Sequence, residues 1–347
     1  MVNIRQSDIA RELNVSRVTV SKALRDHPDI SPEMKKRVNE TVKKMGYIPN
    51  LIARQLNSRR TFTLGIVVPD LENSFFSYMV DSMIDHATEE NYHVILTVSR
   101  EKESVEIKNI ENLIGMRVDG LLVCNSQESQ DTSIYSQIRK MKIPLVFFDR
   151  MVKIRGFSKV VFDDRNGALS ALSQVIRLGF TRIAHFAGYN GINIGRERCN
   201  GYLSALKMHG LPIRKKWIIE GGFEMNDGYG SFMKLLASGE MPEIIFTVND
   251  RVALGVYRAA KESGIKIPSD VSIMGYGFRE TTDFFSPPLA VINQDPRKMG
   301  LIAMKTLIGE IDSRQGRKPV TTYISEEFLR NKSLGIARKP KSFKTLN

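Results

Sequence analysis

Polar and aromatic residues follow the ends of strand-like runs in the central part of the sequence. Carboxylate, amide and guanidinium groups pair well with hydroxyls, and an aromatic face packs against the apolar face of a ring. At the carboxyl ends of parallel strands, such residues are well placed to bind a small polar molecule such as a sugar. The candidates are Asn73, Phe76, Asp149, Arg196, Phe223, Asn249 and Asp250.

The same residues also have structural explanations that the sequence leaves open. Asp250 opens a helix-like segment and could serve only as its cap. Phe76 and Phe223 could be core residues, and for these two aromatics the alternatives weigh equally. Contact with a ligand is the favoured interpretation for Arg196 and Asn249.

A catalytic role for this part of the chain is the alternative. Asp163 and Asp164 are neighbouring carboxylates at one strand end, and Asp149 ends another strand. Such carboxylates could in principle serve a glycosidase. However, GYNGINIG at 188–195 lacks the GxGxxG spacing of a dinucleotide site, and neither GxxxxGKS/T nor HExxH occurs. The five histidines show no spacing typical of metal ligands. We therefore expect no catalytic residue, no cofactor and no metal. An enzyme acting on a sugar-like substrate, with a fused DNA-binding head, is the alternative.

Residues 1–60 form a basic segment, with 13 Lys and Arg against 6 Asp and Glu. Residues 61–329 hold 32 residues of each sign, so the excess positive charge lies at the two ends of the chain. A basic segment beside a neutral body is typical of a module that binds a polyanion. The basic residues at 330–347 are interpreted as an aid to solubility.

The segment QSDIARELNVSRVTVSKALRDHP predicts two short helices joined by a tight turn, and a third helix follows. Ser7, Ser16 and Ser31 are the expected caps. Asn14 is expected in the left-handed conformation of the turn, and the third helix is expected to run to about Met45. Three such helices make a helix-turn-helix DNA-binding unit. A small three-helix core with an ordinary solvated face is the alternative.

The second helix and the segment after the third could both contact DNA. In the major groove, Arg17 and Lys22 could donate to guanine edges, and Val18 could contact a thymine methyl group. Residues 46–61, GYIPNLIARQLNSRRT, are too apolar for a plain linker and too short for a stable isolated helix. We expect this segment to fold on DNA, where Leu56 could wedge into a base step from the minor groove.

Residues 4–60 resemble the DNA-binding head of the lactose-repressor (LacI/GalR) family of bacterial transcription regulators. The matching motifs are DIARELNVSRVTVSKAL, GYIPNLIARQL and TLGIVVPDLENSFF, and the resemblance extends to about residue 335. It implies that Thr19 and Ser21 contact phosphate and that Leu56 is the wedge of a hinge helix. The DNA contacts expected in all are Ser16, Arg17, Val18, Thr19, Ser21, Lys22, Asn50, Ala53 and Leu56.

The resemblance implies a transcription regulator, most often a repressor of carbohydrate-utilisation genes, that binds a palindromic operator in double-stranded DNA as a homodimer. A small-molecule effector, a sugar or sugar derivative, would bind between two lobes and control DNA binding by allostery. The candidates named first, apart from Asn73, match positions that line the effector cleft of the family. Whether the effector releases the DNA or holds the protein on it stays open.

Strand-like and helix-length segments alternate from residue 61 onward, which predicts an α/β fold with doubly wound parallel sheets. The repeat units are too many for one sheet, so two lobes are expected, and the resemblance implies lobes like those of periplasmic binding proteins. The expected divisions are a head at 1–47, a hinge helix and linker at 48–60, a core at 61–335 and a basic tail at 336–347. Within the core, lobe one is expected at about 61–160 with 291–323, and lobe two at about 161–290 with 324–335.

One position departs from the pattern of the family. After the run VSIMGY the family usually places an acidic residue that grips the effector, but this chain has Gly277 followed by Phe278. A sugar remains the expected effector. Because the loss of a carboxylate favours a negatively charged ligand, an uncommon or acidic sugar becomes more plausible.

The remaining features indicate a cytoplasmic protein without a membrane partner. MVNIRQSDIARELN has no apolar core of a secretory signal, and no run approaches the ~18 apolar residues of a membrane span. Cys124 and Cys199 are far apart in sequence, which argues for a reducing compartment. The tail shows no leucine heptads, so we expect no tetramer formed through a tail coiled coil.

Overall fold

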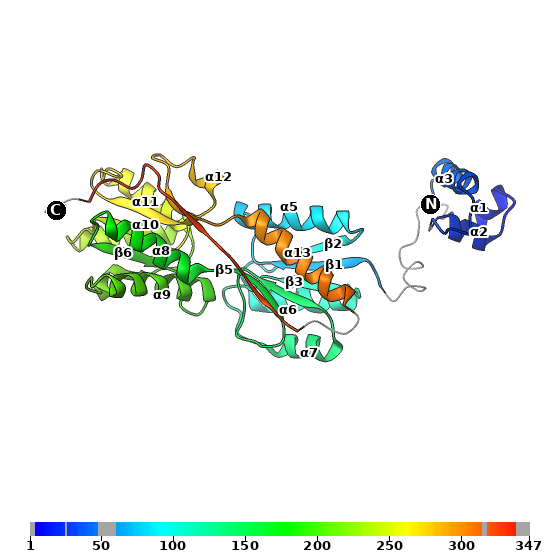
Figure 1. Ribbon diagram of the computed structural model, residues 1–347, viewed down its shortest axis with the longest axis horizontal. Helices are drawn as coiled ribbons and strands as arrows, with labels where there is room; N and C mark the ends of the chain where they lie inside the picture. Colours follow the sequence, from blue (N-terminus) through cyan, green and yellow to red (C-terminus); the bar gives the residue numbers. More distant parts are fainter. Residues whose placement is uncertain (1–3, 25, 48–59, 314–317, 338–347) are drawn as a thin grey trace. The chain divides into compact units, whose positions relative to one another are not determined.

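The computed structural model describes residues 4–24, 26–47, 60–313 and 318–337. The chain divides into two compact units, the first ending at Thr61 and the second beginning at Phe62. Figure 1 shows that the second unit consists of two lobes, each with a sheet flanked by helices.

Within residues 4–24 and 26–47, three helices form the first unit: α1 (Gln6–Glu12), α2 (Arg17–Ala23) and α3 (Pro32–Met45). Their apolar faces share one small core, which confirms the predicted helix-turn-helix unit. The buried residues of this core are Ile9, Ala10, Val20, Ala23 and Val38.

Polar caps set the boundaries of α2 and α3. The Ser16 Oγ accepts a hydrogen bond from the Thr19 N–H at 2.9 Å, and the Ser31 Oγ accepts one from the Met34 N–H at 3.3 Å. Asn14 has a φ of 55°, the left-handed conformation predicted for the turn. These local signals fix where α2 and α3 begin.

The start of α1 differs from the sequence prediction. The expectation that Ser7 caps this helix is wrong, because α1 begins at Gln6 with Arg5 as its N-cap, so Ser7 lies within the first turn. The Asp8 carboxylate accepts a hydrogen bond from the Arg5 N–H at 2.8 Å instead. A carboxylate in the first turn also interacts favourably with the positive end of the helix dipole, which a serine hydroxyl does only weakly.

Lobe one has, in its described part, a six-stranded parallel sheet in the order β11-β5-β4-β3-β1-β2. The strands are β1 (Thr63–Val68), β2 (His93–Val98), β3 (Gly120–Val123), β4 (Leu145–Phe148), β5 (Ser158–Phe162) and β11 (Thr321–Ile324). One face carries α5 (Ser74–Glu89) and α13 (Pro296–Asp312), and the other carries α6 (Glu103–Gly115) and α7 (Ser133–Met141). In β1, Ile66 joins the first core and Val67 the second, as the two-residue period of a strand requires.

Lobe two has a second sheet, in the order β12-β10-β9-β8-β6-β7, in which only the β10–β12 pair is antiparallel among the described strands. The strands are β6 (Ile183–Ala187), β7 (Ile218–Glu220), β8 (Ile244–Thr247), β9 (Ser272–Gly277), β10 (Ala290–Asn293) and β12 (Glu327–Leu329). One face carries α8 (Asp164–Arg177) and α9 (Asn193–Met208), and the other carries α10 (Met225–Ala237) and α11 (Asp250–Glu262). The short helices η1 (Lys215–Trp217) and α12 (Arg279–Thr282) complete the lobe.

The described chain crosses between the lobes three times (Figure 1). β5 leads into α8, β10 leads into α13, and β11 leads into β12. The lobe boundaries expected at 160, 290 and 323 therefore move to 162, 293 and 324. The largest shift has a simple cause, because β10 pairs with β9 and so belongs to the sheet of lobe two.

Candidate DNA-reading helix and ligand cavity

The outer face of α2 presents the residues that the sequence assigns to base reading. Ser16 and Arg17 are exposed, and 64% of the Val18 side chain is accessible, so an apolar side chain stands free at the start of this helix. The Thr19 Oγ1 lies 2.8 Å from the Ser16 Oγ, which ties the first turn together. Ser21 is half-buried on the same helix.

Lys22 is engaged within the head itself. Its Nζ lies 2.7 Å from the Asp29 Oδ2, and this hydrogen bond is the main reason why the pKa of Asp29 is lowered. Its ammonium group has three N–H donors, so it can bind Asp29 and still donate to a base. Of the other expected DNA contacts, Asn50, Ala53 and Leu56 lie outside the described residues, so the wedge role of Leu56 stays a prediction.

A cavity of about 40 Å³, here called the inner cavity, lies between the two lobes. Residues that follow β1 and β4 line it from lobe one, and residues that follow β8 or end β9 line it from lobe two. Six of the seven ligand candidates meet here, and Arg196 does not. The lining residues are Asn73, Phe75, Phe76, Asp149, Arg150, Ile194, Arg198, Phe223, Asn249, Asp250, Tyr276, Gly277 and Gln294.

Asn249 and Asp250 combine structural roles with their place on the cavity wall. The Asn249 Oδ1 accepts the Val252 N–H at 2.8 Å and caps α11, while its Nδ2 donates to the Phe223 carbonyl oxygen at 2.9 Å. The Asp250 Oδ2 accepts a hydrogen bond from the Thr281 hydroxyl at 3.2 Å. Burial raises the pKa of Asp250, so this carboxylate gains from a ligand that donates hydrogen bonds.

Asp149 is buried at the end of β4, with a left-handed φ of 55°. Burial raises its pKa to about 6, although the charge of the neighbouring Arg150 opposes the shift. Its backbone carbonyl oxygen accepts a hydrogen bond from the Asn193 Nδ2 of lobe two at 3.0 Å. Asp149 therefore touches both the cavity and the opposite lobe.

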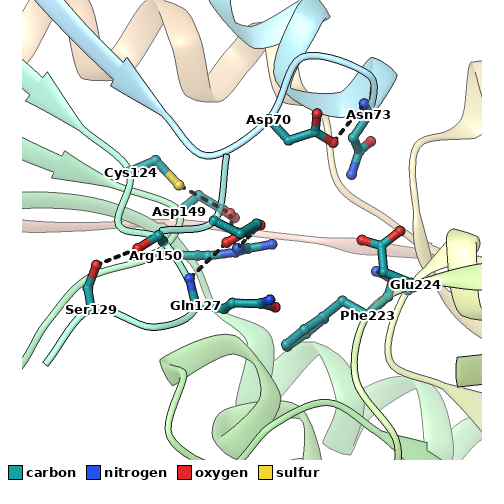
Figure 2. Close-up of polar contacts among 12 residues, drawn as sticks. Asp70, Asn73, Cys124, Gln127, Ser129, Asp149, Arg150, Phe223 and Glu224 are labelled. Carbon is teal, nitrogen blue, oxygen red and sulfur yellow. Dashed lines mark hydrogen bonds and ion pairs between the residues drawn. The ribbon is translucent and has the colours of Figure 1, made fainter. Parts of the chain in front are cut away.

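Arg150 spans the space between the two candidate aromatics. Its Cζ atom lies 5.6 Å from the ring centre of Phe76 in lobe one and 5.4 Å from that of Phe223 in lobe two. Its Nη1 lies 2.7 Å from the Glu101 Oε1. Figure 2 shows the Arg150 side chain extending toward Phe223 of the opposite lobe. A planar cation thus occupies the position between two rings where the face of a ligand ring would pack.

The arginine that reaches the inner cavity from α9 is Arg198, which the sequence analysis missed. It is buried, and its Nε lies 2.7 Å from the Asp164 Oδ1 while its Nη2 donates to the Gln294 Oε1 at 3.0 Å. Its Cζ lies 4.0 Å from the ring centre of Tyr276, and its Nη1 donates to the Val248 carbonyl oxygen.

Helical phase explains why Arg198 and not Arg196 faces the inner cavity. Tyr202 and Ala205 are buried on α9, and Arg198 lies four and seven residues before them, the spacings that keep one face of a helix. Arg196 is two residues away, on a different side of the helix. Its Nε lies 3.1 Å from the Glu197 Oε1, and it lines a second cavity. The periodicity of α9 could have revealed this difference in the sequence.

Gln294 and Glu326, which lie on two of the three crossings, join the same buried group. The Gln294 Nε2 donates to the Asp164 Oδ1 at 3.1 Å and to the Glu326 Oε1. Burial, and then the charge of Asp164, raises the pKa of Glu326 to about 9. Its Oε2 is buried without a hydrogen-bond partner among the described residues. Glu326 is therefore protonated at neutral pH, which leaves Asp164 to balance the charge of Arg198.

The glycine that replaces the usual acidic residue has a steric explanation. A Cβ atom on Gly277 would lie 3.0 Å from the Asp250 Cβ and 2.9 Å from the Thr282 Cγ2. Both distances are tighter than ordinary carbon contacts, so a side chain here would displace its neighbours. Asp250 consequently supplies the carboxylate at this end of the inner cavity.

The chain matches two family models. Residues 7–50 match the bacterial regulatory proteins of the lacI family, and residues 61–332 match the periplasmic binding proteins and sugar binding domain of the LacI family. Catabolite control protein A of Priestia megaterium is 31% identical over 88% of this chain and 92% of its own length. The probable HTH-type transcriptional repressor ExuR of Bacillus subtilis is 30% identical over 90% of this chain and 92% of its own.

A solved structure shares the fold of the whole chain. The lac repressor dimer bound to operator and the anti-inducer ONPF superposes with a TM-score of 0.84, at 24% identity, over 95% of this chain and 98% of that one. A helix-turn-helix head joined to a two-lobed ligand-binding unit defines a ligand-responsive DNA-binding transcription regulator. The chain belongs to the LacI family of bacterial transcription regulators.

The alternative of an enzyme is not supported. The matching family models describe regulators and ligand-binding domains, and both relatives named above are regulatory proteins, so the chain is not an enzyme. In the part of the chain that the structure describes, no helix is long and apolar enough to cross a membrane. No group of three or more His, Cys, Asp or Glu residues among the described positions could hold a metal ion.

Proposed function

We propose that this protein represses genes of carbohydrate utilisation by binding a palindromic operator as a homodimer in the cytoplasm. A sugar or sugar derivative in the inner cavity controls its affinity for DNA. The solved lac repressor dimer on its operator, which shares the fold of the whole chain, supports the dimeric arrangement.

The observation that carries this proposal is that both lobes contribute ligand-binding groups to one cavity. Lobe one supplies Phe76 and Asp149, and lobe two supplies Phe223, Asn249 and Arg198. A ligand that contacts both lobes binds one lobe arrangement better than another and so shifts the population between them. Hydrogen-bonding groups between two aromatic rings suit a ring that carries hydroxyls.

The inner cavity is too small for a sugar in the present lobe arrangement. Its volume of about 40 Å³ is far below the roughly 300 Å³ at which ligand pockets begin. The Arg150 guanidinium lies near both Phe76 and Phe223, at 5.6 and 5.4 Å from their ring centres. A ligand must therefore displace Arg150 or separate the lobes, and either movement links binding to lobe geometry.

Contacts across the cleft hold the present arrangement. The Arg251 Nη1 of lobe two lies 3.2 Å from the Asp70 Oδ2 of lobe one. A second ion pair joins the lobes, because the Arg297 Nη1 of lobe one lies 2.9 Å from the Glu280 Oε1 of lobe two. These pairs are partly exposed, so each is worth at most about 1 kcal/mol, which a bound effector can readily offset.

The direct test is a selection of genomic fragments by the purified full chain, at physiological salt and without added ligand. Enrichment of one palindromic site is the expected result, and the genes beside it identify the pathway that supplies the effector. The proposal is overturned if the enriched fragments share no site, both without ligand and with an extract of sugar metabolites added as co-repressors.

A further inference from the structure

A second cavity, here called the outer cavity, adjoins the inner one. Its volume is about 300 Å³, and Arg150 lines both cavities. Lobe one lines it with the loop after β3 and the loop after β4, and lobe two lines it with the start of α9. The lining residues are Asn125, Ser126, Gln127, Ser129, Gln130, Thr132, Arg150, Met151, Val152, Lys153, Gly191, Ile192, Asn193 and Arg196.

The charges on the outer cavity are all positive. Arg150, Lys153 and Arg196 line it, and no carboxylate does so among the described residues. Glu101 and Glu197 pair with Arg150 and Arg196 but are not part of the lining. Lys153 is exposed and makes no ion pair within the described part of the chain. The rest of the wall consists mainly of hydroxyl and amide groups. Several of these already donate hydrogen bonds to carboxylates behind the wall: the Gln127 N–H to Glu101, the Gln130 N–H to Glu103 and the Ser129 hydroxyl to Glu106. The charges of Arg150, Lys153 and Arg196 are therefore the main attraction for an anion.

The N-terminus of α9 adds to this positive potential. The helix has 16 residues, and its N-cap, Ile192, has no side chain that could accept a hydrogen bond from the first turn. Ile192 and Asn193 both line the outer cavity. The uncapped N–H groups and the helix dipole therefore favour negative charge at this end of the cavity.

Arg150 offers a buried hydrogen-bond donor at the border of the two cavities. Its side chain is 8% exposed, and its buried Nε has no hydrogen-bond partner among the described residues. The Asp149 Oδ2 lies 3.9 Å from this atom, too far for a hydrogen bond. Buried guanidinium nitrogens are normally satisfied, so this donor indicates an acceptor that binds where the two cavities meet. Figure 2 shows Gln127 and Ser129 on the loop beside Arg150.

We propose that the outer cavity binds an anionic group of the effector, a phosphate or a carboxylate, while the effector's ring occupies the inner cavity. The effector is then a sugar phosphate or a sugar acid. This inference rests on the proposed ligand role of the inner cavity. Lys153 and Arg196 supply charge from opposite lobes, so an anion between them also pulls the lobes together.

The test measures binding to the full chain by calorimetry with defined probes. The probes are inorganic phosphate, acetate, and the neutral, 6-phosphate and 6-carboxylate forms of glucose and galactose. The Lys153→Gln and Arg196→Gln double variant removes two charges of the outer cavity without touching the core. Lys140→Gln with Lys207→Gln is the matched control, since both lysines are exposed on helices of the same two lobes.

We expect phosphate or acetate to bind the wild type and the control pair, and to lose about tenfold in affinity in the double variant. An anionic hexose should likewise lose its advantage over its neutral parent in the double variant. The phosphate and carboxylate arms show which anion the cavity prefers. Equal binding by the double variant and the control pair overturns the inference, as does the absence of any anion binding.

These outcomes are distinct from failure of the proposed function. If the genomic selection yields an operator but no anion effect appears, only the assignment of the outer cavity fails. If no operator is enriched, the regulator proposal fails whatever the anions do.

Discussion

Arg198 is the residue on which the effector response should depend most. Its guanidinium reaches Asp164, Gln294 and the Val248 carbonyl at once, which an ammonium group cannot do. The effector changes the affinity for operator DNA by a certain factor in the wild type. We expect this factor to be smaller by at least about tenfold in Arg198→Lys. Operator binding without effector should stay within about twofold. The measurement is fluorescence anisotropy with labelled operator, with and without effector.

Arg196→Lys is the matched control for this experiment, because it makes the same change two residues away on α9. It keeps the positive charge of the outer cavity, so its effector response should be normal. A normal response in Arg198→Lys, or an equal loss in both variants, would contradict the assignment of Arg198 to the effector site.

Glu326 should make stability depend on pH. Its pKa is raised from the ordinary value of 4.5 to about 9 in the folded protein. Between pH 4.5 and pH 9, the carboxyl group is therefore ionised in the unfolded chain but protonated in the folded one. The free energy of unfolding therefore falls as pH rises through this window, by at most about 1.4 kcal/mol per pH unit. Glu326→Gln, which mimics the protonated acid, should lose less stability than the wild type between pH 5 and pH 9.

Urea unfolding at pH 5, 7 and 9 provides the measurement. Glu327→Gln is the control, because Glu327 is an exposed neighbour on β12. Parallel pH curves for Glu326→Gln and the wild type would show that Glu326 does not hold a proton in the folded state.

At the scale of elements, the outer face of α2 should decide which sequence is bound. Arg17→Ala combined with Val18→Ala removes two exposed side chains that we expect to contact base edges in the major groove. We expect the free energy of operator binding to weaken by about 1–3 kcal/mol for each base contact that is lost. The preference for particular bases should relax at the corresponding positions of the DNA site. Selection from a randomised half-site library measures this preference.

Arg11→Ala is the control for α2, since its side chain is 83% exposed on α1 and lies outside the reading face. It should leave the preferred sequence unchanged. If the double variant selects the same half-site with the same stringency as the wild type, Arg17 and Val18 are not the readers.

At the scale of the whole molecule, we expect the dimer to form through exposed apolar side chains of lobe two. Phe284 is 89% exposed and Leu254 on α11 is 47% exposed, and a dimer interface there would remove these large apolar side chains from water. We expect Phe284→Asp to shift the protein toward monomers and to weaken operator binding by more than about tenfold, because two heads no longer bind together. Sedimentation velocity measures the oligomeric state.

Tyr323→Asp is the control, because Tyr323 is a 65% exposed aromatic residue of lobe one. This variant should leave the dimer intact. Monomers in both variants, or in neither, would contradict the placement of the dimer contact on lobe two.

Local signals in the sequence were sufficient to predict the three helices of the head and the α/β class of the fold. Ser16 and Ser31 cap their helices, and Asn14 takes the left-handed conformation, because these features depend on a few neighbouring residues. Alternating strands and helices also predicted two parallel-sheet lobes. Residues at strand ends, such as Asp149 and Asn249, reached one cavity because the carboxyl ends of parallel strands share an edge.

Only the tertiary structure decided which distant side chains meet at the cavities. The packing of α9 on its sheet places Arg198 inward and Arg196 on the outer cavity. The crossings bring Gln294 against Asp164, 130 positions away, and place Glu326 where the charge of Asp164 acts on it. Such contacts depend on the register of two sheets and on the angle between two lobes. No short stretch of sequence encodes these long-range quantities, whereas a cap or a strand end is encoded within a few residues.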